Sequence, residues 1–209
     1  MELGADDFLS KPFDGSVLMA KIAALAVVGA VLILLCSLLP GTELLGVELK
    51  SFVVCFLIDL ILFVAVGLTG HLYGGCVLAF LLPVLRYYLA GMMSPVLMIP
   101  QIMAECFMLL FFCLVVQKHK PVFLLIGYIG GAAVKYAVLW LVVNKVLTRY
   151  SSLVTLFQNL DNEAAEQAAV SLMKAQTLHG QLVCALLGGL TAFLLLPMLK
   201  EFLRKKFRA

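Results

Sequence analysis

Four charged residues lie well inside long apolar stretches of the sequence: Asp59, Arg86, Glu105 and Lys135. A charged side chain is costly to bury in a bilayer, so each is a candidate for binding a solute or moving an ion. Two acids and two bases also sum to zero, and buried charges are rarely tolerated without partners. The sequence therefore leaves two interpretations open, a binding site and mutual pairing within one bundle, and they do not exclude each other.

Polar and aromatic neighbours accompany these charges at helical spacing. Gln101 and Glu105 are four residues apart and therefore share a helix face. Tyr128 and Lys135 share a face of the next apolar stretch, where small residues between them allow close approach of a neighbour or ligand. Trp140 forms an aromatic pair with the residue four positions before it. Together with the four charges, these residues predict a polar, aromatic-walled pocket for a small solute.

Other kinds of chemistry find little support in the sequence. No C-x-x-C pair occurs, and His71, His119 and His179 lie in separate connections, so we expect no metal site. Motifs for a nucleophilic serine, a zinc peptidase or a phosphate-binding loop are also missing from the sequence. We therefore expect a protein that is not an enzyme and needs no cofactor. Six cysteines are interpreted as small packing residues within the apolar stretches: Cys36, Cys55, Cys76, Cys106, Cys113 and Cys184.

The composition determines which elements position these residues. Of 209 residues, 64% are hydrophobic and 13% are charged, and the mean hydropathy is +1.11. Continuous apolar stretches of about 20 residues predict membrane-spanning helices, because barrel strands alternate apolar and polar residues. The expected fold class is all-α, an integral membrane bundle of six transmembrane helices. The predicted spans are 22–39, 51–68, 71–89, 95–116, 122–146 and 182–199.

Lysine and arginine residues predict the orientation of this bundle. Nine lie at one set of span ends and only four at the other, and basic loops stay cytoplasmic. Both termini are therefore predicted to be cytoplasmic, in a multi-pass protein of the bacterial cytoplasmic membrane. The formal charge of +3 is explained by a basic C-terminal tail, so we expect the lipid bilayer and no nucleic acid as a partner.

One long connection, 148–181, is predicted to lie on the outer side. Asp161 and Asn162 are suited to capping a helix, and Glu163 and Glu166 would follow in its first turn, where the helix dipole favours acids. A modest apolar stripe comes after them. We expect one or two short helices over the outer mouth of the bundle, acting as a lid or serving only as a membrane-surface connection.

Several segments resemble a known transporter family. The third span and following turn, 73–95, the start of the fourth span, 98–105, with Glu105, and the entry to the sixth span, 176–181, are similar to the substrate-binding S component of energy-coupling factor (ECF) transporters, in an uncharacterised branch. The resemblance covers about residues 16–206. It implies capture of a small micronutrient, such as a vitamin or its precursor, from the outer side. It also implies two kinds of partner, a transmembrane T component and two cytoplasmic ATPases.

The same resemblance implies a docking face on the first span. In that family an A-x-x-x-A pattern near the cytoplasmic end of the first helix contacts the T component. Ala20 and Ala24 match the pattern, although Lys21 between them departs from the family, and Ala26 with Ala30 is a second candidate deeper in the span. Both pairs are of the small-residue type that permits close helix contact.

The N-terminal segment resembles something different. Residues 4–25, with a Lys11-Pro12 turn, are similar to the last strand and final helix of a response-regulator receiver domain. A phospho-accepting aspartate and the rest of a receiver would be needed for phosphotransfer, so none is expected. We interpret 1–15 as a fused remnant, a misplaced gene start or an engineered junction ahead of a membrane domain at 16–209.

Three functions are weighed on these grounds. The first is a substrate-binding subunit for micronutrient uptake. The second is a structural scaffold similar to the rod-shape-determining membrane protein D, and the third is a stand-alone transporter or channel that uses the four charges as an ion path. The cytoplasmic half of the predicted bundle is nearly bare of polar groups, which argues against an ion path.

Overall fold

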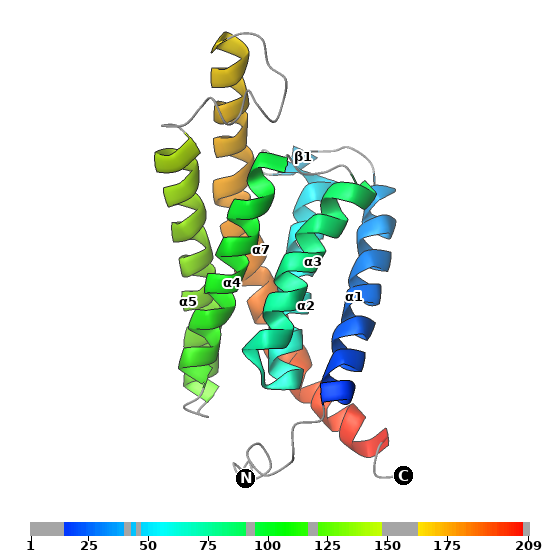
Figure 1. The fold of residues 1–209 in the computed structure, drawn as a ribbon. Helices are drawn as coiled ribbons and strands as arrows, with labels where there is room; N and C mark the ends of the chain where they lie inside the picture. The colour runs from blue at the N-terminus through cyan, green and yellow to red at the C-terminus, as the bar shows by residue number, and fades with distance from the viewer. Residues whose placement is uncertain are drawn as a thin grey trace.

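A computed structural model describes residues 15–39, 43–44, 47–90, 95–116, 121–147 and 163–206. Long helices lie side by side in an up-and-down bundle (Figure 1). The helices are α1 (Gly15–Ser37), α2 (Leu49–Thr69), α3 (Leu72–Ala90), α4 (Pro95–Val116), α5 (Pro121–Leu141), which continues into the π-helical turn η2 (Val142–Leu147), and α7 (Glu163–Lys206). Between α1 and α2, the two-residue strands β1 (Glu43–Leu44) and β2 (Val47–Glu48) pair antiparallel.

Six segments within these helices are long and apolar enough to cross a membrane, as a multi-pass membrane protein requires. The largest shift from the predicted boundaries is four residues, at the start of the first span. The predicted all-α class and its six spans are therefore confirmed within the described residues. The segments are Leu18–Ser37, Leu49–Thr69, Leu72–Leu89, Leu97–Val116, Val122–Lys145 and Gly180–Glu201.

The turn between α2 and α3 shows why these two helices are adjacent and antiparallel. Gly70 has a φ of 69°, a left-handed conformation that glycine adopts without strain, and its N–H donates to the Val66 carbonyl at 2.8 Å. The Thr69 hydroxyl donates to the Ala65 carbonyl at 2.7 Å and satisfies another carbonyl of the last turn. Because α3 begins two residues later, it must run back along α2.

Helix α2 is central and α1 is peripheral. Of the residues in their spans, 56% are buried inside the bundle for α2 and 22% for α1. Helix α2 packs against α1, α3 and α7 and touches α4, while α4 packs against α3 and α5, and α5 against α7. A side chain on the inner face of α2 is therefore within reach of several neighbouring helices.

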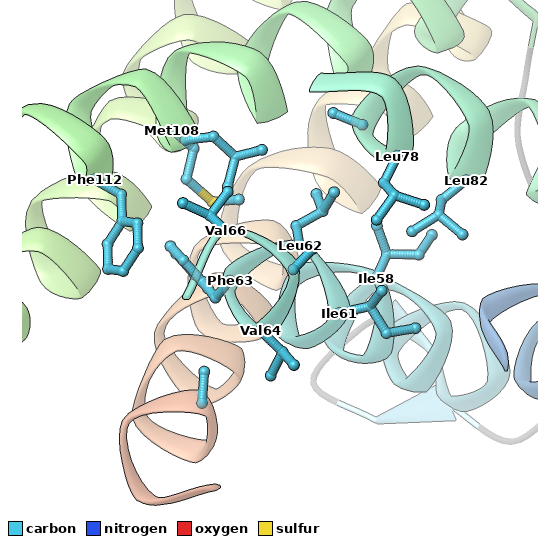
Figure 2. Close-up of a cluster of buried hydrophobic side chains, with 14 of the residues drawn as sticks. Ile58, Ile61, Leu62, Phe63, Val64, Val66, Leu78, Leu82, Met108 and Phe112 are labelled. Atoms are coloured by element: carbon cyan, nitrogen blue, oxygen red, sulfur yellow. The ribbon is translucent and has the colours of Figure 1, made fainter. Parts of the chain in front are cut away.

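The apolar core is centred on α2 (Figure 2). Ile58 and Leu62 lie toward Leu78 and Leu82 of α3, and Phe63 lies toward α4. All five side chains are at most 3% exposed, so the three helices are held together by a continuous apolar contact. Large apolar side chains also cover the outer surface of the bundle, as expected for helices that face lipid.

Helix α7 differs from the prediction for the long outer connection. Residues 148–162 lie outside the described part of the chain, but 163–179 form a helix continuous with the sixth span instead of a separate short one. This extension rises in line with the span, beyond the upper ends of α2, α3 and α4 (Figure 1), and does not lie across them. Residues 163–179 contain no proline or glycine, so nothing in the sequence ends the helix before the span begins. At a rise of 1.5 Å per residue the extension is about 25 Å long.

The described part of the receiver-like segment belongs to the first membrane-spanning helix. Residues 1–14 lie outside the described part of the chain, and residues 15–25 form the first turns of α1. No boundary within α1 separates these turns from the membrane-spanning helix that follows.

Candidate functional site

Three polar side chains on α2 begin the site. Ser51, Cys55 and Asp59 follow one another at four-residue spacing and therefore share one face of the helix. Asp59 is fully buried near the middle of its span, whereas Ser51 lies near the start of α2. We call the end of the bundle at which α2 and α4 begin and α3 ends the upper end, as it is drawn in Figure 1.

The buried charges of three helices meet at mid-span. Lys135 of α5 donates to Asp59 Oδ1 at 2.5 Å, and its Nζ lies 3.9 Å from Glu105 Oε1 of α4. All three side chains are at most 1% exposed. The mutual pairing considered from the sequence is therefore confirmed for Asp59 and Lys135. A charge-assisted hydrogen bond of this length is strong, and its desolvated surroundings screen it little.

Two glutamines extend these contacts toward the upper end. Gln101 Nε2 donates to Glu105 Oε1 at 2.7 Å and to Gln181 Oε1 of α7 at 3.2 Å. Gln181 Nε2 in turn donates to Cys55 Sγ at 3.0 Å. The contacts thus form a closed circuit that runs through α2, α5, α4 and α7 and returns to α2.

Arg86 adds a fifth helix, α3, to this circuit. Its Nη1 donates to Cys55 Sγ at 2.9 Å and its Nη2 donates to Ser51 Oγ at 2.5 Å. The side chain is 5% exposed and lies near the upper end of its span. We call the whole set the polar network. Its members are Ser51, Cys55, Asp59, Arg86, Gln101, Glu105, Lys135 and Gln181.

An aromatic cluster lies directly below the polar network. It consists of Phe63, Phe112, Tyr128 and Phe193. The ring of Tyr128 lies 4.7 Å from that of Phe112 and 5.0 Å from that of Phe63, centroid to centroid. These closely packed rings separate the polar network from the lower part of the bundle along this line.

Two residues predicted for the site do not join the polar network. Tyr128 is buried, but it lies seven residues or about 10 Å below Lys135 along α5, and its hydroxyl has no hydrogen-bond partner among the described residues. Trp140 is 44% exposed on the outside of the bundle. Five residues of α-helix rotate a side chain by roughly 140° relative to Lys135, which explains why Trp140 faces away.

Three members of the network were not singled out from the sequence. Cys55 was interpreted as a packing residue, Ser51 as the start of a span, and Gln181 as part of the entry to the sixth span. The four-residue spacing of Ser51 and Cys55 before Asp59 was the available signal. Cys184, one turn below Gln181 on α7, lies beside the network, and its thiol donates to the Phe52 carbonyl of α2 at 3.3 Å.

Two acceptor atoms at the inner end of the network lack partners. Asp59 Oδ2 and Glu105 Oε2 are buried and make no hydrogen bond to any described residue. An unpaired buried acceptor is unfavourable, so these atoms mark a place where a bound solute, water or proton would be stabilised. Within the same described residues, no cluster of three side chains is suited to holding a metal ion.

The alanine pairs of α1 lie in different surroundings. Ala20 and Ala24 are exposed on the outside of the bundle, whereas Ala26 and Ala30 are half-buried. Ala26 packs against the apolar core of the protein itself. The first pair is therefore the one available for contact with another chain.

Comparison of this chain with protein-family models, with curated proteins and with solved structures gives no match. What the fold and the site define is a class, a multi-pass helical membrane protein with a buried polar network in one half of its bundle.

Proposed function

We propose that this protein is the membrane-embedded, substrate-binding subunit of an ECF-type uptake transporter in a bacterial cytoplasmic membrane. It would capture a small polar micronutrient, such as a vitamin or vitamin precursor, from the outer side. The single observation that carries this proposal is the one-sided placement of the polar network. It reaches from the upper end of the bundle to mid-span and stops at the aromatic cluster.

A one-sided network suits capture better than free passage. A solute entering from the upper end would meet guanidinium, amide and carboxylate groups that replace its lost water. Further inward it would meet the packed rings of Phe63, Phe112 and Tyr128. Release to the other side would then require movement of the whole subunit, which fits a binding component driven by ATPases better than a channel.

The peripheral position of α1 supports the proposed partners. Ala20 and Ala24 lie on an exposed face of this helix, where small side chains allow another helix to approach closely. We propose this face as the contact with a T component, which in turn binds two cytoplasmic ATPases.

One observation favours the alternative of a structural scaffold similar to the rod-shape-determining membrane protein D. Lys135 and Asp59 satisfy each other directly, as they would in a bundle that needs its charges only for packing. The unpartnered oxygens of Asp59 and Glu105 favour the binding subunit, because a purely structural network gains nothing from them.

Ligand stabilisation distinguishes these functions. The purified protein would be analysed by mass spectrometry for copurified small molecules, and its thermal unfolding measured against a panel of vitamins, their precursors and nucleobases. A ligand at 100 times its Kd stabilises the folded state by about 2.7 kcal/mol. We expect one compound to raise the unfolding temperature of the wild type.

The variants Arg86→Ala and Gln101→Ala should lose that rise, because both remove donors from the polar network. Trp140→Ala is the matched control, since this large side chain lies on the outside of α5, and it should retain the full rise. Absence of any copurified compound and of any stabilisation across the panel would contradict the proposal and favour the scaffold.

A further inference from the structure

The inner end of the polar network contains two acids and one base. Lys135 Nζ lies 2.5 Å from Asp59 Oδ1, which is a close charge-assisted hydrogen bond. Its 3.9 Å separation from Glu105 Oε1 is too long for a hydrogen bond. The ammonium group therefore donates its hydrogen bond to Asp59, and Glu105 is a second acid that lies within ion-pair distance of the same cation.

Among the described residues, the other groups that face Glu105 add no second positive charge. On its own helix, the neutral amide of Gln101 donates to Oε1, and that amide also contacts Gln181 of α7. From α2, Glu105 faces the acid Asp59 and the thiol of Cys55, and from α5 it faces Lys135. The second carboxylate oxygen, Oε2, makes no hydrogen bond to any described residue.

The other buried base of the network is directed elsewhere. Arg86, on α3, donates to Ser51 and Cys55 of α2 near the upper end of the bundle. That position is close to the upper end of its span. Its hydrogen bonds thus serve the upper part of the network, above the level of Glu105.

Glu105 is fully buried, its hydrogen bond at Oε1 comes from a neutral amide, and the one cation beside it is shared with Asp59. A carboxylate in this position is unfavourable in its charged form and takes up a proton instead. We propose that Glu105 is a proton-binding site, and that in the resting protein it is a neutral carboxylic acid beside the Asp59–Lys135 ion pair. The proton comes from a hydronium ion: one of its O–H bonds breaks, an O–H bond forms on the Glu105 carboxylate, and a water molecule is released.

The position of Glu105 indicates the side from which the proton exchanges. Gln101, Gln181 and Cys55 connect Glu105 to the upper end of the bundle through side chains that exchange hydrogen bonds. Below it, Phe112 and Tyr128 belong to the aromatic cluster. Proton uptake and release at Glu105 are therefore expected from the upper side only. This inference goes beyond the proposed function, because it holds for a binding subunit and for a scaffold alike.

Infrared spectroscopy of the protein in a maltoside detergent, which has no carbonyl group of its own, tests this inference directly, because a protonated carboxylic acid has a carbonyl band that an ionised carboxylate lacks. The wild type at neutral pH is expected to show this band, with a shift on transfer to heavy water. Glu105→Gln should remove it. Glutamine keeps the shape of the side chain and the acceptor for Gln101, so the variant is expected to fold. Glu201→Gln, at an exposed position of α7, is the control and should keep the band.

Two further variants test whether Glu105 is protonated because Lys135 pairs with Asp59. In Asp59→Asn the ammonium of Lys135 is released to Glu105, so the band should disappear although Glu105 is present. In Lys135→Met both acids lose their cation, and the band should grow. A band that persists in Glu105→Gln, or a wild type without one, would overturn the proton site. A band that persists in Asp59→Asn would overturn the assignment of Lys135 to Asp59 as its cause.

Discussion

The contact between Asp59 and Lys135 is the residue-scale feature with the clearest energetic consequence. Both side chains are at most 1% exposed, so both charges have lost their water. In such a pair the desolvation penalty offsets much of the Coulomb attraction, and the net gain over an apolar pair is small. Removal of one partner is different, because it leaves the other charge buried and uncompensated.

We therefore expect Lys135→Met to destabilise the bundle by about 3–5 kcal/mol. The double variant Asp59→Leu/Lys135→Met should recover most of that loss, because neither charge is left behind. The measurement is the free energy of unfolding in mixed micelles, followed by the loss of helical circular dichroism. Lys21→Met, at an exposed position of α1, is the control and should leave the stability almost unchanged. An equal loss of unfolding free energy in Lys135→Met and in Lys21→Met would refute the expectation.

Much of the site could be predicted at the residue scale, for a physical reason. Charged residues inside apolar spans are rare enough that Asp59, Glu105 and Lys135 stand out in the sequence, and the structure brings them together. Cys55 could not be recognised in this way, because cysteine is a small residue that is common in apolar spans. The four-residue spacing of Trp140 from Tyr136 indicates an aromatic pair. It does not indicate on which side of α5 that pair lies relative to Lys135.

At the scale of the helices, two glycines determine how closely α7 approaches the site. A Cβ atom added at Gly188 would lie 3.0 Å from the Leu60 backbone nitrogen and 3.1 Å from Asp59 Cβ. At Gly189 it would lie 3.0 Å from Tyr128 Cβ. The backbone of α7 thus contacts α2 and α5 directly, at the boundary between the polar network and the aromatic cluster.

This geometry predicts different outcomes for two glycine-to-alanine substitutions. Gly188→Ala should cost about 1–3 kcal/mol, because the new methyl group meets the backbone of α2, which cannot move aside alone. Gly67→Ala is the matched control on α2. The nearest atoms to its methyl group would be side-chain carbons of Leu196, Cδ1, Cδ2 and Cγ, and this side chain can adopt another rotamer. Thermal unfolding of both variants measures the difference, and an equal loss of stability would contradict the role assigned to Gly188.

The helices themselves could be predicted more completely than their arrangement. Hydropathy identifies each span, since about 20 apolar residues have few alternatives to a membrane helix. It does not indicate that α2 is central, because the mean hydropathy of its span, 2.7, is almost the same as the 2.6 of the peripheral α1. Hydropathy also does not indicate that residues 163–179 and the sixth span form one helix, because an amphipathic pattern next to a span equally predicts a separate surface helix.

At the scale of the whole molecule, the bundle is divided along its axis. The upper half contains the polar network, and below mid-span the core is formed by the aromatic cluster and aliphatic side chains. Basic side chains lie at both ends of the described bundle. Lys21 and Lys200 lie toward the lower end, where α1 begins and α7 ends, whereas Lys50 and Lys145 lie toward the upper end.

The sequence as a whole has nine Lys and Arg residues at the ends predicted to be cytoplasmic and four at the others. If basic segments stay in the cytoplasm, the lower end of the bundle is cytoplasmic and the network opens outward. We therefore expect a cysteine introduced at Ser16 or Glu201 to react with a membrane-impermeant maleimide only in inside-out vesicles. A cysteine at Gln167, in the extension of α7, should react only in right-side-out vesicles.

The parent protein serves as the background for this labelling experiment, because its six free cysteines are buried or half-buried within the spans. The inverse labelling pattern would place the polar network on the cytoplasmic side. Uptake from outside would then be excluded even if a ligand had been found, whereas the proton site at Glu105 would remain and would exchange with the cytoplasm. The orientation of the bundle thus determines from which side of the membrane a solute or proton reaches the network, while the residues of the network determine what it binds.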